Sequence, residues 1–213
     1  MTAARDDDFM ALPGMEADST DTHHARERLS DDATPGSAIT SSNASPNASS
    51  KSALDALLDE YRARAKSERE KGTLFEELTR QFLLHDARFA HQFKEIYLWS
   101  EWPEHRTGDT GIDLVAIPVR DGEGPVAIQC KFYALGHRIQ KADIDSFLSA
   151  SGKEPFGRRI VVDTSGAPWG KNAQDAIEGQ QIPVSRITLA DLRDSDIDWR
   201  TYSLGSTQAP KTR

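Results

Sequence analysis

The sequence has one cysteine, Cys130, and no long hydrophobic run. A lone cysteine excludes an intrachain disulfide and suits a reducing cytoplasm. No stretch approaches the roughly 20 apolar residues that a transmembrane helix needs. The first ten residues carry Asp and Arg without the apolar run of a signal peptide. We therefore expect a cytoplasmic protein with no membrane partner.

An excess of positive charge is also lacking, because 26 Lys and Arg stand against 34 Asp and Glu, a formal net charge of −8. Proteins that bind nucleic acid usually present a basic face, so this total argues mildly against DNA binding. This sum, however, mixes a folded domain with the first 52 residues, a stretch that contains Asp clusters and few large apolar side chains. Such a segment cannot bury enough surface to offset the entropy of ordering. We predict a disordered acidic, low-complexity tail over 1–52, a folded domain over 53–200, and a C-terminal tail or linker over 201–213.

Hydrophobic periodicity predicts an α/β order of elements within this domain. A helix begins at Ala53, Gly72 is expected to break or kink it, and a second helix covers 73–85. Strands are predicted over 93–102, 112–119, 125–132, 159–163 and 183–187, with helices over 139–151, 170–177 and 189–193. The chain is long enough for one such domain with a sizeable core.

The two strands of the predicted hairpin, 112–119 and 125–132, are apolar except for Asp113, Gln129 and Lys131. A regular hairpin centred on Gly122 sets Asp113 opposite Lys131 and places all three side chains on one face, unless a bulge intervenes. Cys130 then faces the other way as a small core residue. The spacing allows two interpretations: a buried Asp113–Lys131 ion pair with Gln129 hydrogen-bonded beside it, or a catalytic set.

Asp113 followed by Gln129-Cys130-Lys131 resembles the D…(D/E/Q)-x-K core of PD-(D/E)XK nucleases, and the Gln variant resembles their Mrr-like branch. The Gly-rich approach over 107–115 is similar to the lead-in of that branch, and GTLFE at 72–76 to its first helix. Four further segments are similar to the N-terminal nuclease domain of type ISP restriction–modification enzymes: LWSEWP, IQCKFY, QKADIDSFLSASGK and WGKNA. The resemblance covers about residues 52–199.

This resemblance implies a restriction endonuclease-like fold, with a mixed central β-sheet flanked by helices. It implies an Mg²⁺-dependent endodeoxyribonuclease, with Mn²⁺ as an alternative ion, that cuts double-stranded DNA in the restriction of foreign DNA. Similar enzymes join a helicase and a methyltransferase to the nuclease, so we expect such partners in cis or in trans. Cutting both strands would need two sites, which a transient homodimer would supply.

The implied site combines oxygen ligands for Mg²⁺ with one lysine. Asp113 is the main ligand, Gln129 offers an amide oxygen, Cys130 its backbone carbonyl, and Glu76 a second carboxylate. Lys131 orients the attacking water and stabilises charge on the phosphate. For Glu76 the alternative is a surface pair with Arg80.

Basic residues after the hairpin are predicted to contact DNA phosphates without reading sequence. They are Arg138, Lys141, Lys153, Arg158 and Lys171, with Arg159 as a further candidate. Two other functions stay open at this point. One is a non-catalytic DNA-binding or docking module on the same fold, and the other makes the acidic tail a partner-binding or DNA-mimicking arm.

Overall fold

The computed structural model describes residues 46–105, 108, 110–202 and 210–212, with side chains from Ala53 onward. The predictions made for residues 1–45 lie outside these ranges. The first helix, α1 (Pro46–Arg64), begins before the predicted domain boundary at residue 53. Among the described residues, no helix combines the length and the apolarity needed to cross a bilayer.

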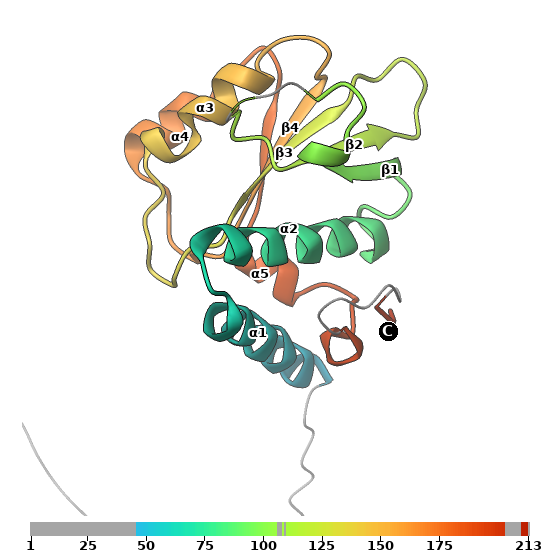
Figure 1. The fold of residues 1–213 in the computed structure, drawn as a ribbon, viewed down its shortest axis with the longest axis vertical. Helices are drawn as coiled ribbons and strands as arrows, with labels where there is room; N and C mark the ends of the chain where they lie inside the picture. The colour runs from blue at the N-terminus through green and yellow to red at the C-terminus, as the bar shows by residue number, and fades with distance from the viewer. Residues whose placement is uncertain (1–45, 106–107, 109, 203–209, 213) are drawn as a thin grey trace, which may run out of the picture. The chain divides into compact units, whose positions relative to one another are not determined.

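Five strands form one mixed sheet in chain order (Figure 1). They are β1 (Phe93–Leu98), β2 (Leu114–Pro118), β3 (Val126–Lys131), β4 (Arg158–Asp163) and β5 (Val184–Ile187). β1, β2 and β3 are antiparallel, whereas β3, β4 and β5 are parallel. Parallel neighbours need crossover connections, which α3 (Lys141–Ser151) and α4 (Lys171–Ile177) provide. The predicted α/β class with a mixed central sheet is confirmed.

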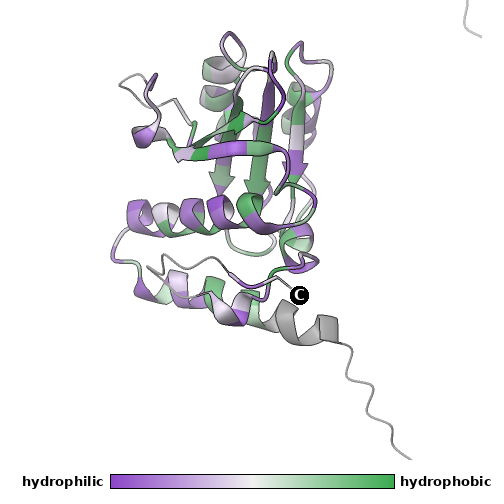
Figure 2. Ribbon diagram, turned by 90° about the vertical axis from the view of Figure 1, so that its right-hand side faces the viewer, coloured by the Kyte–Doolittle hydropathy of each residue, from purple (hydrophilic) through white to green (hydrophobic). Residues whose placement is uncertain are grey.

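Helices cover both faces of the sheet, and each face has its own core. α1, α2 (Glu68–His85) and α5 (Leu189–Arg193) lie on one face, whereas α3 and α4 lie on the other (Figure 1). The strands between them are predominantly hydrophobic, while the helices alternate hydrophobic and hydrophilic residues (Figure 2). Short 3₁₀ turns follow β1 (η1, Trp99–Glu101) and α5 (η2, Trp199–Thr201).

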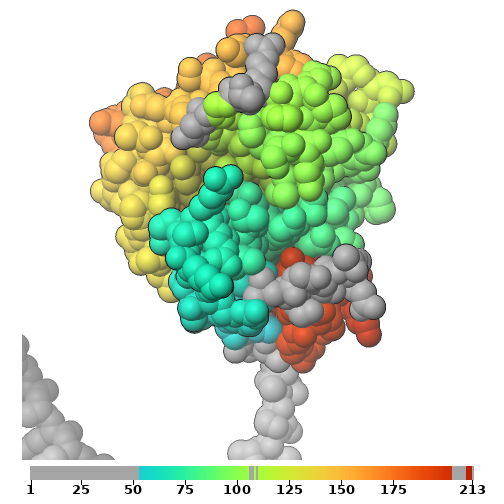
Figure 3. Space-filling model, viewed as in Figure 1, coloured from blue at the N-terminus to red at the C-terminus, as the bar shows by residue number. Residues whose placement is uncertain are grey.

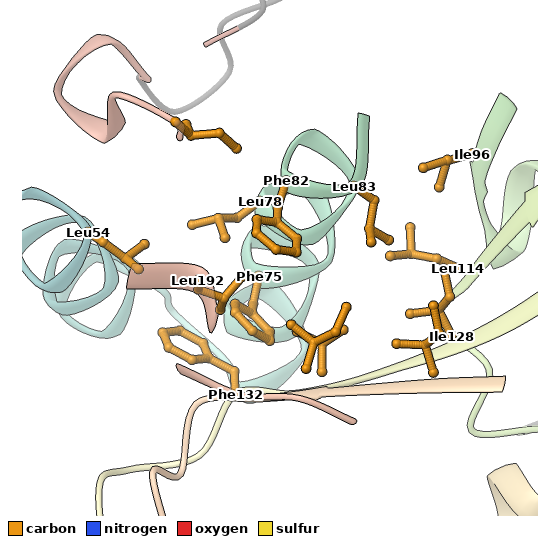
Figure 4. Packing of buried hydrophobic residues seen from close by; sticks show 14 of the residues in the cluster. Leu54, Phe75, Leu78, Phe82, Leu83, Ile96, Leu114, Ile128, Phe132 and Leu192 are labelled. Carbon is orange, nitrogen blue, oxygen red and sulfur yellow. The ribbon is translucent and has the colours of Figure 1, made fainter. Parts of the chain in front are cut away.

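The packing of α2 against the sheet fixes the rotation of this helix (Figure 4). Phe75 is fully buried and stacks on Phe132, with ring centroids 5.0 Å apart and an interplanar angle of 18°. Leu78, Phe82 and Leu83 continue the buried stripe. Each such side chain stabilises the fold by about 1.5–3 kcal/mol. Because the Phe75 side chain points into the core, the side chain of its neighbour Glu76 lies at the edge of the buried face of α2.

Two predicted boundaries differ from the structure. Gly72 lies inside α2, which begins at Glu68, because Ser67 caps the helix by accepting a hydrogen bond of 3.1 Å from the Glu70 N–H. An interior glycine costs a helix only about 1 kcal/mol, which packing here outweighs. The predicted C-terminal tail also returns to the domain, since the Asp198 N–H donates to the Lys211 carbonyl at 2.8 Å.

Candidate active site

The hairpin formed by β2 and β3 has a different register from the predicted one. Leu114 pairs with Ile128, and Ala116 pairs with Val126. These pairs centre the hairpin on Asp121 instead of Gly122. A shift of one residue in the centre moves every partner by two, so the predicted pairing of Asp113 with Lys131 is wrong.

The ladder is irregular at Asp113, just before β2 begins. Ile112 packs in the core on the α3 side, whereas Leu114 packs in the core on the α2 side, so the alternation of side chains breaks between them. The Asp113 N–H donates to the Ile128 carbonyl at 2.9 Å, and its Oδ2 accepts from the Cys130 N–H at 2.6 Å. The Asp113 carboxylate therefore accepts the hydrogen bond that a backbone carbonyl of a neighbouring strand would otherwise accept from the Cys130 N–H. This bond holds the Asp113 side chain at the end of the sheet.

Glu76 approaches the same place from α2. Asp113 and Glu76 both line an open groove between α2 and the segment that joins β1 to β2, two regions whose surfaces meet in Figure 3. Burial, followed by the charges of Asp113 and Glu77, raises the pKa of Glu76 from 4.5 to about 7, while Arg69 lowers it. The predicted surface alternative does not form, because Arg80 pairs with Glu77 at 2.8 Å and with Glu101 at 3.0 Å.

Gln129 lies on the opposite face of β3, towards α3. Its side chain is only 2% exposed, and a Cβ placed on Gly111 would lie 3.0 Å from its Nε2. Gly111 has a φ of +66°, so both its backbone conformation and its lack of a Cβ suit this close approach. Within the described ranges, the Oε1 atom of Gln129 is buried without a hydrogen-bond partner. Leaving such an acceptor unpaired costs about 1–3 kcal/mol, so an ordered water, a ligand or a cation would stabilise it.

Cys130 and Lys131 complete the predicted set. Cys130 packs against the core on the α2 side, as expected, and burial raises its thiol pKa well above the usual value, so it is not a nucleophile. Lys131 is half-buried, with Nζ 6.0 Å from the centre of the Tyr133 ring. In the part of the chain that the structure describes, no carboxylate forms an ion pair with Lys131. The predicted buried Asp113–Lys131 ion pair is therefore absent.

The donor atoms at this end of the sheet are oxygens. No group of three His, Cys, Asp or Glu side chains that could hold a metal occurs among the described residues. The groove offers the carboxylates of Asp113 and Glu76, whereas the unpaired amide oxygen of Gln129 is buried on the α3 side and does not line the groove. Oxygen donors with this little negative charge fit a hard divalent cation that keeps some of its own waters.

The predicted phosphate-binding residues do not share one location. Arg138 and Lys141 are exposed near the start of α3, and Lys171 starts α4. Lys141 pairs with Asp145 and Lys171 with Asp175, so neither cation is free of a carboxylate. Lys153 lies at the other end of α3, where it lines a separate pocket.

Arg158 and Arg159 depart further from that prediction. Arg158 pairs with Val126 at the far end of β3, and its guanidinium lies over Phe93. Arg159 is 1% exposed and donates to the carbonyls of Ile182 and Leu148, so it supports the fold instead of DNA.

The sequence interpretation missed two groove residues, Arg69 and Thr73. Residues 69, 73 and 76 are spaced by four and three positions, so they share one face of α2. This spacing was a usable signal, because Glu76 had already been singled out. Arg69 contributes a positive charge beside the two carboxylates.

Comparison with known proteins identifies the family of the chain. A family model described as a restriction endonuclease, Mrr_cat_2, matches residues 84–209, more than half of the chain. The solved structure of the ATP-dependent type ISP restriction–modification enzyme LlaBIII bound to DNA is 31% identical, with a TM-score of 0.60, over 73% of this chain. This chain spans only 10% of LlaBIII.

Two further restriction endonucleases are more distant. MspJI in complex with a 27-mer oligonucleotide is 20% identical over 75% of this chain and 34% of its own, with a TM-score of 0.44. The DNA modification-dependent enzyme AspBHI is 17% identical over 67% and 34%, with a TM-score of 0.43. No curated protein sequence matches the chain. From the family match, the resemblance inferred from the sequence is confirmed, and the chain belongs to the Mrr_cat_2 family of restriction endonuclease domains.

Proposed function

We propose that this chain is a divalent-metal-dependent endodeoxyribonuclease domain that hydrolyses phosphodiester bonds of double-stranded DNA in the restriction of foreign DNA. One observation carries the proposal: Asp113 and Glu76 line a single open groove at the end of the sheet. Their mutual repulsion contributes to the raised pKa of Glu76. A cation in the groove would relieve that repulsion, and a phosphodiester could reach it because the groove is open.

The carboxylates of Asp113 and Glu76 would hold the ion from the groove. The resemblance implies two further donors, Oε1 of Gln129 and the backbone carbonyl of Cys130, which do not line the groove, so Gln129 would have to reach the ion from the α3 side of β3. Mg²⁺ is the ion that such donors favour, with Mn²⁺ as an alternative. When bound, a divalent ion polarises the phosphate and makes water more acidic. Glutamine in place of an acid lowers the charge of the site by one, so affinity for the ion should be modest.

The remaining chemistry belongs to the chain's own residues. Lys131 forms no ion pair with a described carboxylate, so its ammonium is free to donate to a phosphate oxygen and to orient the attacking water. Arg69, on the α2 wall of the groove, would contact an adjacent phosphate. Arg138, Lys141 and Lys171 would hold the backbone farther along, once DNA competes with the carboxylates that pair two of them.

The domain by itself should nick DNA weakly and without sequence preference, because none of its motifs resembles a base-reading module. A helicase and a methyltransferase, in cis or in trans, would supply translocation and recognition. The match to LlaBIII, an ATP-dependent restriction–modification enzyme, supports this, because the chain covers only 10% of that enzyme and the rest would carry other activities. Cleavage of both strands would require a second copy of the site, which we assign to a transient homodimer.

The test is a plasmid-nicking assay in Mg²⁺ that compares the unaltered chain with Asp113→Ala and Lys131→Ala. Each substitution should reduce the rate by about 100-fold or more. Asp121→Ala and Lys94→Ala are matched controls, because these residues form an exposed pair at the other end of the hairpin, 3.0 Å apart. The controls should cleave at the unaltered rate. Equal cleavage by all five proteins would reject the site.

Thermal unfolding separates this function from a non-catalytic module on the same fold. An ion that binds only the folded state stabilises it by about 2.7 kcal/mol at 100 times its Kd. Mg²⁺ should therefore raise the Tm of the unaltered chain and leave that of Asp113→Ala unchanged. If Asp113→Ala only lowers the Tm, and Mg²⁺ shifts neither protein, the non-catalytic alternative is correct.

A further inference from the structure

A second cavity lies behind the wall of the candidate active site. It has a volume of about 160 Å³ and is lined by Trp99, Trp102 and Phe156, among other residues. Trp99 and Ile112 line both this cavity and the groove that contains Asp113 and Glu76. Since Ile112 directly precedes Asp113, the two hollows are neighbours across one short stretch of chain.

The aromatic rings give the cavity an apolar wall of tilted faces, with interplanar angles of 40° and 42° between successive rings. The ring centroids of Trp99 and Trp102 are 5.5 Å apart, and those of Trp102 and Phe156 are 5.6 Å apart. Trp102 is 5% exposed and belongs to the core, whereas Trp99 is half-buried and keeps part of its ring open. The rings touch each other, so no flat ligand can insert between them. A planar group would instead stack on the open part of Trp99.

The size of the cavity limits what can enter. A cavity of roughly 150 Å³ is enough for one benzene ring. The space of about 160 Å³ therefore fits a single planar ring, not a whole nucleotide or a folded peptide segment. Its polar lining consists of Thr110, Lys153 and the carboxylates of Glu104 and Glu154. A ring with N–H donors at its edge would find hydrogen-bond acceptors there, whereas the two carboxylates disfavour a phosphate inside the cavity.

We propose that this pocket, defined by Trp99, Trp102, Phe156 and Ala150, binds one unpaired nucleobase of the DNA strand that lies in the active-site groove. The inference rests on the proposed nuclease function. A base inside a duplex is stacked on its neighbours, so it must leave the stack to reach the pocket, at a cost of a few kcal/mol. Stacking on an aromatic side chain returns about 1–3 kcal/mol per base, and a single strand has less stacking to lose. The pocket thus favours DNA that is locally unwound at the point of cleavage.

The experiment measures how much each base of a single strand contributes to binding. A 12-nucleotide strand is titrated against the full chain in EDTA, which prevents cleavage, and is compared with strands that carry one abasic site at each position in turn. Removing the base that occupies the pocket should weaken binding about 10-fold, within the range expected for one stacked base. Abasic sites at the other positions should change the Kd less than 3-fold.

Ala150→Leu fills the pocket from α3 and should abolish the position dependence. Ala142→Leu adds the same bulk at an exposed position of α3, so it serves as the matched control and should retain the dependence. Trp99→Leu removes the stacking surface without filling the space and should act like Ala150→Leu. Thermal unfolding verifies that each variant is folded.

Two results would overturn the inference. One is a uniform response to abasic sites in the unaltered chain, which would mean that the pocket takes no base and is free for a side chain of a partner domain. The other is a position dependence that persists in both Ala150→Leu and Trp99→Leu. Neither result depends on Asp113, so a chain that nicks plasmid but shows no base dependence refutes the pocket alone.

Discussion

Replacing Glu76 with glutamine should change how the stability of the metal-free protein depends on pH. Burial, Asp113 and Glu77 raise the pKa of Glu76 from 4.5 to about 7. A carboxyl group with a higher pKa in the folded state binds more protons when folded than when unfolded between these two values. The free energy of unfolding therefore falls as the pH rises from about 4.5 to about 7, because the ionised form is disfavoured only in the folded protein.

The size of the effect follows from the same two values. A shift from 4.5 to about 7 has a ceiling of about 3.4 kcal/mol, at about 1.36 kcal/mol for each pH unit. Glu76 lines an open groove, however, and water screens part of the repulsion. We therefore expect about half of the ceiling, roughly 1.5 kcal/mol. Glutamine has nearly the same shape and does not titrate, so Glu76→Gln should lack this loss.

Urea denaturation at pH 5 and pH 8, in EDTA, measures the difference. From pH 5 to pH 8, the unfolding free energy of the unaltered chain should fall by about 1.5 kcal/mol more than that of Glu76→Gln. Glu60→Gln, at an exposed glutamate that pairs with Arg64, is the control and should follow the unaltered chain at both. If Glu76→Gln runs parallel to the unaltered chain, neither burial nor the charge of Asp113 acts on Glu76, and the proposed arrangement of the groove is wrong.

Three other substitutions probe the support of the site. Asp163→Ala should destabilise the fold by about 3–5 kcal/mol in urea denaturation, because fully buried Asp163 binds Arg186 at 2.6 and 3.0 Å. Gly111→Ala should cost about 1–3 kcal/mol in the same assay, since its φ is +66° and its new Cβ would lie 2.8 Å from Ser146 Oγ and 3.0 Å from Gln129 Nε2. Phe75→Ala should lower the unfolding free energy by about 3–5 kcal/mol, measured in the same urea assay.

The elements of the fold were predictable because each follows from a local pattern. The stripe on α2 follows a period of 3.6 residues, and β2 and β3 are short apolar runs bounded by turn residues, typical of strands buried on both faces; the sequence displays both patterns directly. The beginning of α2 was harder, because a glycine at position 72 suggests a break that the Ser67 cap and the buried Phe75 outweigh. Local propensity is a weak prior wherever tertiary packing can override it.

The site was predictable as a set of residues but not as a geometry. Placing the turn one residue off moved the partner of Asp113 from Gln129 to Lys131, because an antiparallel register changes by two for each residue of the turn. The irregularity at Asp113 depends on which core Ile112 and Leu114 enter, and both residues are equally apolar in the sequence. Arg158 and Arg159 are also indistinguishable in the sequence, yet the alternation of side chains along β4 buries only Arg159.

The charge of the site explains why a glutamine can stand at position 129. Two carboxylates already share the groove, and their repulsion adds to the raised pKa of Glu76. A third carboxylate at position 129 would be buried on the α3 side without water, where an unpaired negative charge is costly. The neutral amide avoids this cost in the metal-free fold and still presents an unpaired oxygen. The arrangement therefore favours the stability of the metal-free fold over tight metal binding.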